Sequence, residues 1–372
     1  MNLPKRLILK LEERKNNHVF RTVKPSNKNK KDFFSNDYLG YARNKRHFVS
    51  NGSSGSRLIS GTHKEHIHVE KFLATFHKGE SSLVFNSGYD ANIGFFSCIP
   101  QKGDIVLYDE LIHASIRDGM RLSLAKHYRF KHNDLEDLEK KIEQQEKNTI
   151  IYVVVESIYS MDGDSPDFKK LKELVQKYSI YLIVDEAHSL GLYGEKGAGL
   201  LALHNLEDDC FARLYTFGKA LGRHGAVWVG SQDLTDYLTN FARSFMYTTA
   251  LPSSLMQEIH EQYSTMEHDD KTREKLNQNI LYYQKMIKKE KLEDSFSLNN
   301  TPIQSFFNEN KSFLIQVSKE LNEKGYNVKP IYAPTVPEGK ERLRISLHSF
   351  NTFKEIDELI GCIKKLLKSD KK

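Results

Sequence analysis

The chain has 372 residues, of which 39% are hydrophobic and 28% charged, and its formal net charge is +6. A chain of this length can bury a large core, and we expect it to form two domains of a soluble globular protein. The longest apolar run, residues 150–155, ends at Glu156 and is too short to cross a bilayer. The modest charge, with acidic residues interspersed throughout, argues against a nucleic-acid partner.

The cysteines and the N-terminus indicate a cytoplasmic protein. Cys98, Cys210 and Cys362 are odd in number and far apart, so they predict neither a disulfide framework nor a zinc knuckle. Residues 1–45 are interpreted as an amphipathic helix and a linker, because the start lacks the long apolar stretch of a secretory signal. The basic stretch 24–32 is either a solvated loop or a region that attracts an anionic partner, such as a nucleotide-bearing thioester or an acidic carrier protein.

Seven short apolar runs, separated by helix-like segments, occupy the middle of the chain. They span residues 82–85, 104–108, 126–130, 150–155, 180–184, 213–217 and 226–230. Near-continuous apolar strands that alternate with helices predict an α/β fold with a mainly parallel sheet covered on both faces. We expect this large domain to span residues 46–255 and to bind its ligand at the carboxyl ends of the strands.

The pattern changes after about residue 250 and predicts a smaller α+β domain over residues 256–372. The charged stretch 257–291 is expected to form one long helix that bridges the two domains. Beyond it, an apolar stripe at Phe313, Val317 and Leu321 predicts a helix, and residues 342–347 predict a strand before a final helix.

Four polar motifs fall at or just after the ends of predicted strands. They are NSGYDAN (86–92), ESIYSMDGD (156–164), DEAH (185–188) and TFGK (216–219). A glycine at a helix start offers backbone N–H groups to a phosphate, and burial of a lysine in a glycine-rich bend favours its reactive neutral form. Pyridoxal phosphate would use all of these features, because it needs an amine, a carboxylate beside its ring nitrogen and donors for its phosphate. Lys219 and Asp185, on consecutive strands, would suit it.

Three other interpretations of the motifs fail on spacing. DEAH also marks nucleic-acid helicases, but these require a G-x-x-x-x-G-K-[ST] loop, and Gly218-Lys219 lacks the upstream glycine. The segment GEKGAGL (194–200) lacks the G-x-G-x-x-G order of a dinucleotide site. HKEHIH (63–68) matches no zinc spacing and is predicted to be a helix start that carries surface histidines.

The chain resembles the α-oxoamine synthases, pyridoxal-phosphate enzymes of the aspartate-aminotransferase fold, which is fold type I. The motifs that carry the resemblance follow one another along nearly the whole chain: NDYLG, GSRLISGTH, NSGYDAN, DELIHASIRDG, ESIYSMDGD, VDEAHSLGLYGEKGAG, TFGKALG, YTTALP and RLRISL. The resemblance implies a large domain with a seven-stranded sheet and a smaller C-terminal domain. It also implies a homodimer with its active site at the subunit boundary, and a decarboxylative condensation of an amino acid with an acyl thioester.

The resemblance assigns roles to residues around the cofactor. Lys219 would form the imine and later remove the α-proton, His113 would stack on the pyridine ring, and Asp185 would pair with the ring nitrogen. The remaining cofactor contacts would come from His188 and Ser160 at the ring oxygen, and from Gly88, Tyr89, Thr216 and the other subunit's Thr249 at the phosphate.

The resemblance also assigns substrate-handling positions to Arg21, Thr335 and Arg344. Arg344 would bind the amino-acid carboxylate through its bidentate guanidinium. Arg342 stays an alternative, because residues two apart on a strand point to the same face.

The stretches TFGKALGRHGAVWVGS and APTVPEGKERLRISLHSFNT are most similar to the family members that join L-alanine to a pimeloyl thioester in biotin synthesis. Glycine C-acetyltransferase and other α-oxoamine synthases are the alternatives, and a non-catalytic protein that binds the cofactor as a sensor or scaffold is a more distant one. The choice of amino acid depends on room for one methyl group, and the acyl carrier is either coenzyme A or a carrier protein.

Overall fold

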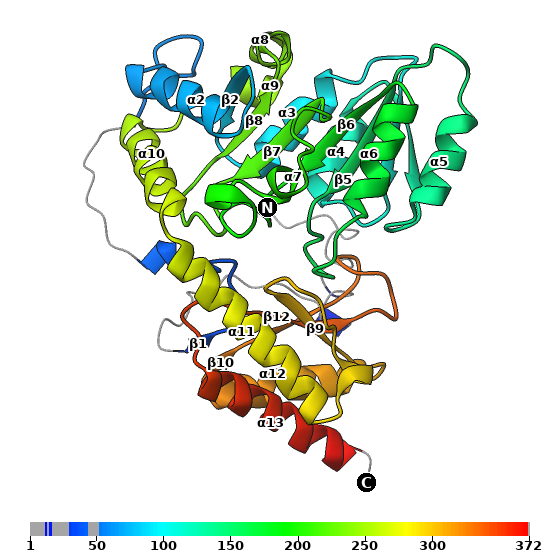
Figure 1. Cartoon of the computed structure of the whole chain (residues 1–372), viewed down its shortest axis with the longest axis vertical. Coiled ribbons are helices and arrows are strands. Elements are labelled where there is room, and N and C mark those ends of the chain that lie inside the picture. Colours follow the sequence, from blue (N-terminus) through cyan, green and yellow to red (C-terminus); the bar gives the residue numbers. More distant parts are fainter. Residues whose placement is uncertain (1–11, 13–14, 17–29, 44–51, 371–372) are drawn as a thin grey trace.

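The structure is a computed structural model that describes residues 12, 15–16, 30–43 and 52–370. Figure 1 shows a large domain built around a sheet, and below it a smaller domain that contains the C-terminal helix. Most of the predicted N-terminal helix, most of the basic stretch and Arg21 lie outside the described residues. Within the described part of the chain, no helix is long and apolar enough to span a bilayer.

The large domain contains the predicted seven-stranded sheet. Its strands are β2 (Ser81–Phe85), β3 (Ile105–Asp109), β4 (Lys126–Phe130), β5 (Ile151–Glu156), β6 (Ile180–Asp185), β7 (Ala212–Thr216) and β8 (Ala226–Gly230). The order is β2-β8-β7-β6-β5-β3-β4, and β8 runs antiparallel to both of its neighbours, whereas the pairs from β7 to β4 are parallel. Each strand lies within one residue of its predicted bounds.

Burial of both faces explains why the central strands are almost continuously apolar. Every residue of β5 is buried, and so is every residue of β6 except Tyr181. Val153 and Leu182 pack into the core on one face, and Val154 and Ile183 pack into the core on the other. The surrounding helices are α2 (Lys64–Phe76), α3 (Gly88–Cys98), α4 (Ala114–Leu122), α5 (Leu135–Glu143), α6 (Phe168–Lys177), α7 (Leu200–Leu203), α8 (Gln232–Phe241) and α9 (Arg243–Met246), with short 3-10 helices η1 (Tyr41–Arg43) and η2 (Glu195–Gly197).

The histidine-rich segment begins a helix, but its histidines are not all on the surface as predicted. α2 starts at Lys64 with His63 as its N-cap. His66 is buried, with its Nε2 atom 2.9 Å from the carbonyl oxygen of Leu251. This histidine therefore belongs to the core, where its ring finds a backbone partner.

The smaller domain is built on a three-stranded antiparallel sheet. Its strands are β9 (Ile303–Phe307), β11 (Lys329–Ile331) and β12 (Arg342–Ser346), and β12 is central. α12 (Lys311–Glu323) and α13 (Phe353–Asp370) confirm the predicted helices, and η3 (Glu293–Ser295) precedes the sheet. β1 (Lys31–Asp32), which lies within the predicted helix-and-linker region, pairs in parallel with β10 (Tyr326–Asn327) and so joins this domain.

The stretch 257–291 forms two helices, so the prediction of one long helix is wrong. α10 (Ser253–Glu267) ends with His268 as its C-cap, and α11 (Asp270–Lys289) begins with Asp269 as its N-cap, whose carboxylate accepts the N–H of Thr272. This cap satisfies a backbone donor at the new helix start. In Figure 1, α10 lies beside α2 and α11 lies over the smaller domain. The predicted domain boundary, between residues 255 and 256, falls inside α10.

Candidate active site

Three neighbouring parallel strands end in polar residues at the same edge of the sheet. Glu156 is the last residue of β5, Asp185 of β6 and Thr216 of β7, and Glu156 is paired in register with Asp185. A pocket of about 280 Å³ opens at this edge. Its lining includes the predicted residues Gly88, Tyr89, His113, Asp185, His188, Thr216 and Lys219. None of them lines the larger hollow of about 610 Å³ beside α2 and α8.

Lys219 follows β7 in a bend that contains two glycines with positive φ, Gly222 and Gly225. Burial lowers the pKa of its amine below the ordinary value, although the nearby carboxylates of Asp185 and Glu156 oppose this shift. The positive charge of Arg344 adds to the lowering. The site therefore favours the neutral, nucleophilic amine at a lower pH than water does.

The carboxylate of Asp185 is buried and held in one orientation. Its Oδ1 accepts the N–H of Ala187 at 3.0 Å, and its Oδ2 accepts from the Asn92 amide at 3.2 Å. The same amide nitrogen donates to Ser115 Oγ at 3.0 Å. Asn92 is on α3, and the sequence assigned it no role of its own because only the fold brings this helix over the end of β6.

The start of α3 and the end of β7 form a cradle for an anionic group. Thr216 Oγ1 is buried and has no hydrogen-bond partner among the described residues. A Cβ atom on Gly88, the first residue of α3, would lie 2.7 Å from Thr216 Cγ2. Only glycine therefore lets the helix start approach the hydroxyl so closely, and the N–H groups there favour a phosphate. An unpartnered buried hydroxyl is costly unless a ligand accepts its hydrogen bond, so this donor set fits pyridoxal phosphate.

His113 lies at the pocket as the N-cap of α4 and is exposed. Partial burial of its ring and the charge of Lys219 lower the pKa of its imidazole. Its Nδ1 atom is 2.7 Å from Ser115 Oγ, and its backbone N–H donates to Glu156 Oε1. These two contacts hold the residue in place and leave its ring open to the pocket, so the ring can stack on a planar ligand.

Glu156 is a pocket residue to which the sequence motifs assigned no specific role. It is 3% exposed, and burial together with the neighbouring Asp185 raises the pKa of its carboxyl to about 8. The charge of Lys219 and the hydrogen bond from the His113 N–H oppose this shift by lowering the pKa of Glu156. Its position at the end of a predicted strand, in line with Asp185, was the only signal in the sequence.

Arg344 lies behind the pocket rather than in its lining. Its Nη2 donates to Asn36 Oδ1 at 3.0 Å and to Tyr38 Oη at 3.2 Å, and Tyr38 Oη in turn lies 2.9 Å from His188 Nδ1. Burial lowers the pKa of His188 well below its ordinary value. Arg342, the alternative, forms an ion pair with Asp162 instead.

Besides Arg344, three predicted residues that the structure describes do not line the pocket of one chain. Ser160 is not in the lining, and its carbonyl oxygen accepts from Arg344 Nε at 2.7 Å. Thr249 is exposed, and its carbonyl oxygen accepts from the Asn86 amide at 2.9 Å. Thr335 is exposed in the loop before β12, and Arg21 lies outside the described residues.

The profile of the family described as aminotransferase class I and II matches residues 28–363. The chain belongs to the aminotransferase class I and II family. A curated relative, the 8-amino-7-oxononanoate synthase of Emericella nidulans, is 40% identical over 333 residues, which cover 84% of this chain and 80% of the relative.

Solved structures show the same fold. An 8-amino-7-oxononanoate synthase from Francisella tularensis is 29% identical with a TM-score of 0.78, and the match covers 93% of this chain and 100% of that one. A serine palmitoyltransferase from S. paucimobilis with bound pyridoxal phosphate is 26% identical with a TM-score of 0.88, and the match covers 98% and 97%. The predicted resemblance to α-oxoamine synthases and the predicted fold type I are confirmed. This family member is a pyridoxal-phosphate-dependent acyltransferase.

Proposed function

We propose that the chain condenses L-alanine with a pimeloyl thioester, with loss of carbon dioxide and thiol, to form 8-amino-7-oxononanoate for biotin synthesis. The observation that carries the reaction class is the meeting of a buried lysine, a fixed carboxylate and a phosphate cradle at the adjacent ends of β6 and β7, beside the start of α3. The substrates are supported by relatives named 8-amino-7-oxononanoate synthase at 35–40% identity.

Pyridoxal phosphate, when bound, supplies an aldehyde and a ring that accepts electrons from the substrate. Lys219 would hold the cofactor through its amine and, once displaced by the amino acid, would take the proton from the amino acid's Cα. The lowered pKa of Lys219 suits both tasks, because each requires the neutral amine. Asp185, held by Asn92 and Ala187, would keep the ring nitrogen protonated.

The other pocket residues would position the cofactor and exclude water. Thr216 Oγ1 and the N–H groups of Gly88 and Tyr89 would bind the phosphate, with His113 against the ring face. His188 has a strongly lowered pKa and would face the ring oxygen as a neutral imidazole.

The substrate side involves residues from outside the pocket lining. Arg344 would bind the amino-acid carboxylate after small shifts of its present partners, while Thr335 and Arg21 would contact the substrates. Ser160 would contact the ring oxygen.

A homodimer would bring Thr249 to the partner's phosphate. In support, the backbone of Thr249 bridges to Ser56, and the neighbouring side chains of Leu58 and Ile59 are 51% and 87% exposed. Sedimentation velocity at micromolar concentration should give the mass of two chains, and a monomer would contradict this part of the proposal.

Product identification tests the function. The holoenzyme is incubated with alanine, glycine or serine and with pimeloyl-CoA, a pimeloyl carrier protein, acetyl-CoA or palmitoyl-CoA, and the products are identified by mass spectrometry. We expect 8-amino-7-oxononanoate from alanine with one or both pimeloyl thioesters, and none with Lys219→Ala. A product from glycine and acetyl-CoA would favour glycine C-acetyltransferase, and one from serine and palmitoyl-CoA would favour the palmitoyltransferase activity of the structural relatives. No product from any pair would favour a non-catalytic protein.

A further inference from the structure

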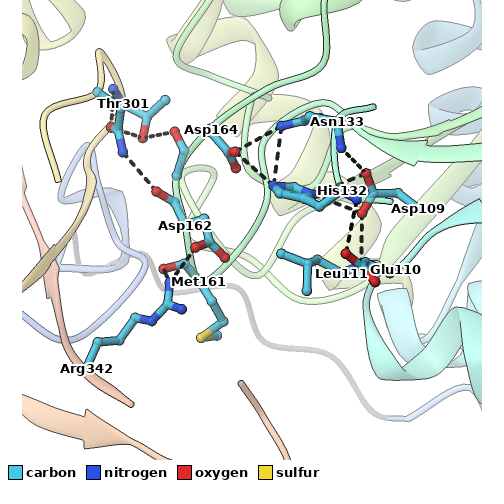
Figure 2. Close-up of polar contacts among 12 residues, drawn as sticks. Asp109, Glu110, Leu111, His132, Asn133, Met161, Asp162, Asp164, Thr301 and Arg342 are labelled. Carbon is cyan, nitrogen blue, oxygen red and sulfur yellow. Dashed lines mark hydrogen bonds and ion pairs between the residues drawn. The ribbon is translucent and has the colours of Figure 1, made fainter. Parts of the chain in front are cut away.

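The loop between β5 and α6, residues 157–167, connects the pocket to the smaller domain. Four consecutive carbonyl oxygens of this loop each accept a hydrogen bond from a side chain of that domain. The donors are Arg344 Nε to Ser160 (2.7 Å), Ser305 Oγ to Met161 (3.1 Å), the Asn299 amide to Asp162 (2.9 Å) and Thr301 Oγ1 to Gly163 (2.8 Å). Figure 2 shows this side of the loop, with the ion pair between Arg342 and Asp162.

The loop is shaped for this close approach. Its middle part, residues 159–164, is closed into a turn by hydrogen bonds from the Tyr159 N–H to the Asp164 carbonyl (3.0 Å) and from the Gly163 N–H to the Tyr159 carbonyl (2.8 Å). Gly163 has a φ of +71°, and a Cβ atom there would lie 2.2 Å from the carbonyl oxygen of Ile303. A side chain at residue 163 would therefore push the loop away from β9.

The opposite side of the loop is held by His132, which follows β4 in the large domain. Its Nε2 lies 2.8 Å from Asp164 Oδ2, and its Nδ1 lies 2.9 Å from Asp109 Oδ1 (Figure 2). Asn133 reinforces the bridge, because its amide donates to Asp164 at 2.9 Å and its N–H to Asp109 at 2.8 Å. Tyr159 packs edge-on against the His132 ring, with the centroids 4.5 Å apart.

The bridge requires a charged histidine. Asp109 is completely buried and ends β3, so its carboxylate needs a compensating charge. Burial alone would lower the pKa of His132, but its hydrogen bonds to Asp109 and Asp164 outweigh burial and raise the pKa to about 10. Both ring nitrogens can therefore donate at neutral pH, one to each carboxylate.

We propose that His132 is a positioning residue for the active site. By bridging Asp109 and Asp164 it fixes the β5–α6 loop, and the loop in turn fixes Arg344 and the other side chains of the smaller domain that donate to it. Neither His132 nor Asp164 lines the pocket, so the effect is transmitted through the Ser160 carbonyl to Arg344 Nε. The inference rests on the proposed function only in the choice of L-alanine as the amino acid whose KM is measured.

The test compares the His132→Gln and Asp164→Asn holoenzymes with wild type. Glutamine is neutral and carries its donors on one nitrogen, whereas the charged imidazole donates from two, and asparagine keeps the shape of Asp164 while removing its charge. The matched control is His127→Gln, which changes an exposed histidine on β4. Hydrogen exchange of peptides that cover residues 157–167 reports on the loop without any substrate, and kinetics with L-alanine give KM and kcat separately.

We expect faster exchange in the loop for both variants and a rise of about tenfold or more in the KM for the amino acid. The kcat should fall by less than about threefold, because Lys219 and Asp185 stay in place. Thr301→Val, which removes a hydrogen bond on the other side of the loop, should act in the same direction and less than additively with His132→Gln.

Loop exchange and KM within about twofold of the control in His132→Gln and Asp164→Asn would overturn the proposal. If His132→Gln does not fold, Asp164→Asn and Thr301→Val decide the same question, because each alters one side of the loop only. If no amino acid is a substrate, the proposed function fails, whereas the exchange measurement still decides whether His132 holds the loop.

Discussion

The substitution Glu156→Gln tests how the buried carboxyl at the end of β5 makes folding stability depend on pH. Burial and the neighbouring Asp185 raise the pKa of Glu156 from 4.5 to about 8. Between these pH values the folded chain keeps a proton that the unfolded chain has released. Each pH unit in that interval therefore lowers the free energy of unfolding by about 1.4 kcal/mol, or roughly 3–5 kcal/mol over the whole interval. This contribution is fully present below pH 4.5 and is lost as the pH rises to about 8.

The assay is urea unfolding of the cofactor-free protein between pH 5.5 and pH 9, followed by tryptophan fluorescence. The single tryptophan, Trp228, is buried in the sheet of the large domain and reports on that domain. Glutamine removes the ionisation but keeps an oxygen that accepts the His113 N–H. We expect the stability of Glu156→Gln to fall less steeply with pH than that of wild type, by up to about 1.4 kcal/mol per pH unit. Glu338→Gln, a change in an exposed loop, is the control.

Parallel pH curves for wild type and Glu156→Gln would refute this reasoning. They would show that Glu156 ionises in the folded state as it does in the unfolded chain. The pocket beside Asp185 and Lys219 would then be well solvated, and the lowered pKa of Lys219, which also depends on burial, would be in question.

Three further predictions concern the cofactor. Lys219→Ala should fold but lose the visible absorbance that survives dialysis of the wild-type holoenzyme. Borohydride labelling of another lysine in the wild-type protein would contradict the assignment. Gly88→Ala should weaken cofactor binding by about 10- to 100-fold in a fluorescence titration, because its Cβ would meet Thr216, and the same clash should lower folding stability by about 1–3 kcal/mol. Unchanged affinity would show that the cradle is not used. Thr216→Val should stabilise the cofactor-free protein by about 1 kcal/mol in urea unfolding, because it removes an unpartnered buried hydroxyl. The same substitution should weaken cofactor binding. The opposite sign of either change would contradict the role of this hydroxyl.

Local sequence predicted the sheet and the strand-end part of the site. The strands of the sheet centre are apolar on both faces, so runs such as residues 150–155 and 180–184 stand out without knowledge of their neighbours. Carboxyl ends of parallel strands meet at one edge, and this rule alone predicts that Asp185 and Lys219 lie together. The break between α10 and α11 was missed, because the capping signal at Asp269 is weak within a continuous run of charged, helix-favouring residues.

Residue order along the chain was thus enough to determine the fold class, the lysine and the carboxylate at strand ends, and the glycine that a phosphate cradle requires. These features follow from backbone conformation and from the periodicity of burial, both of which are local. Only the tertiary structure decided that Asn92 holds Asp185, that Glu156 is a buried pocket carboxyl, and that Arg344 reaches Asn36 across 308 residues of chain. Such contacts join residues that are far apart in the sequence and meet only when the core packs. No short stretch of sequence specifies which of these residues will meet.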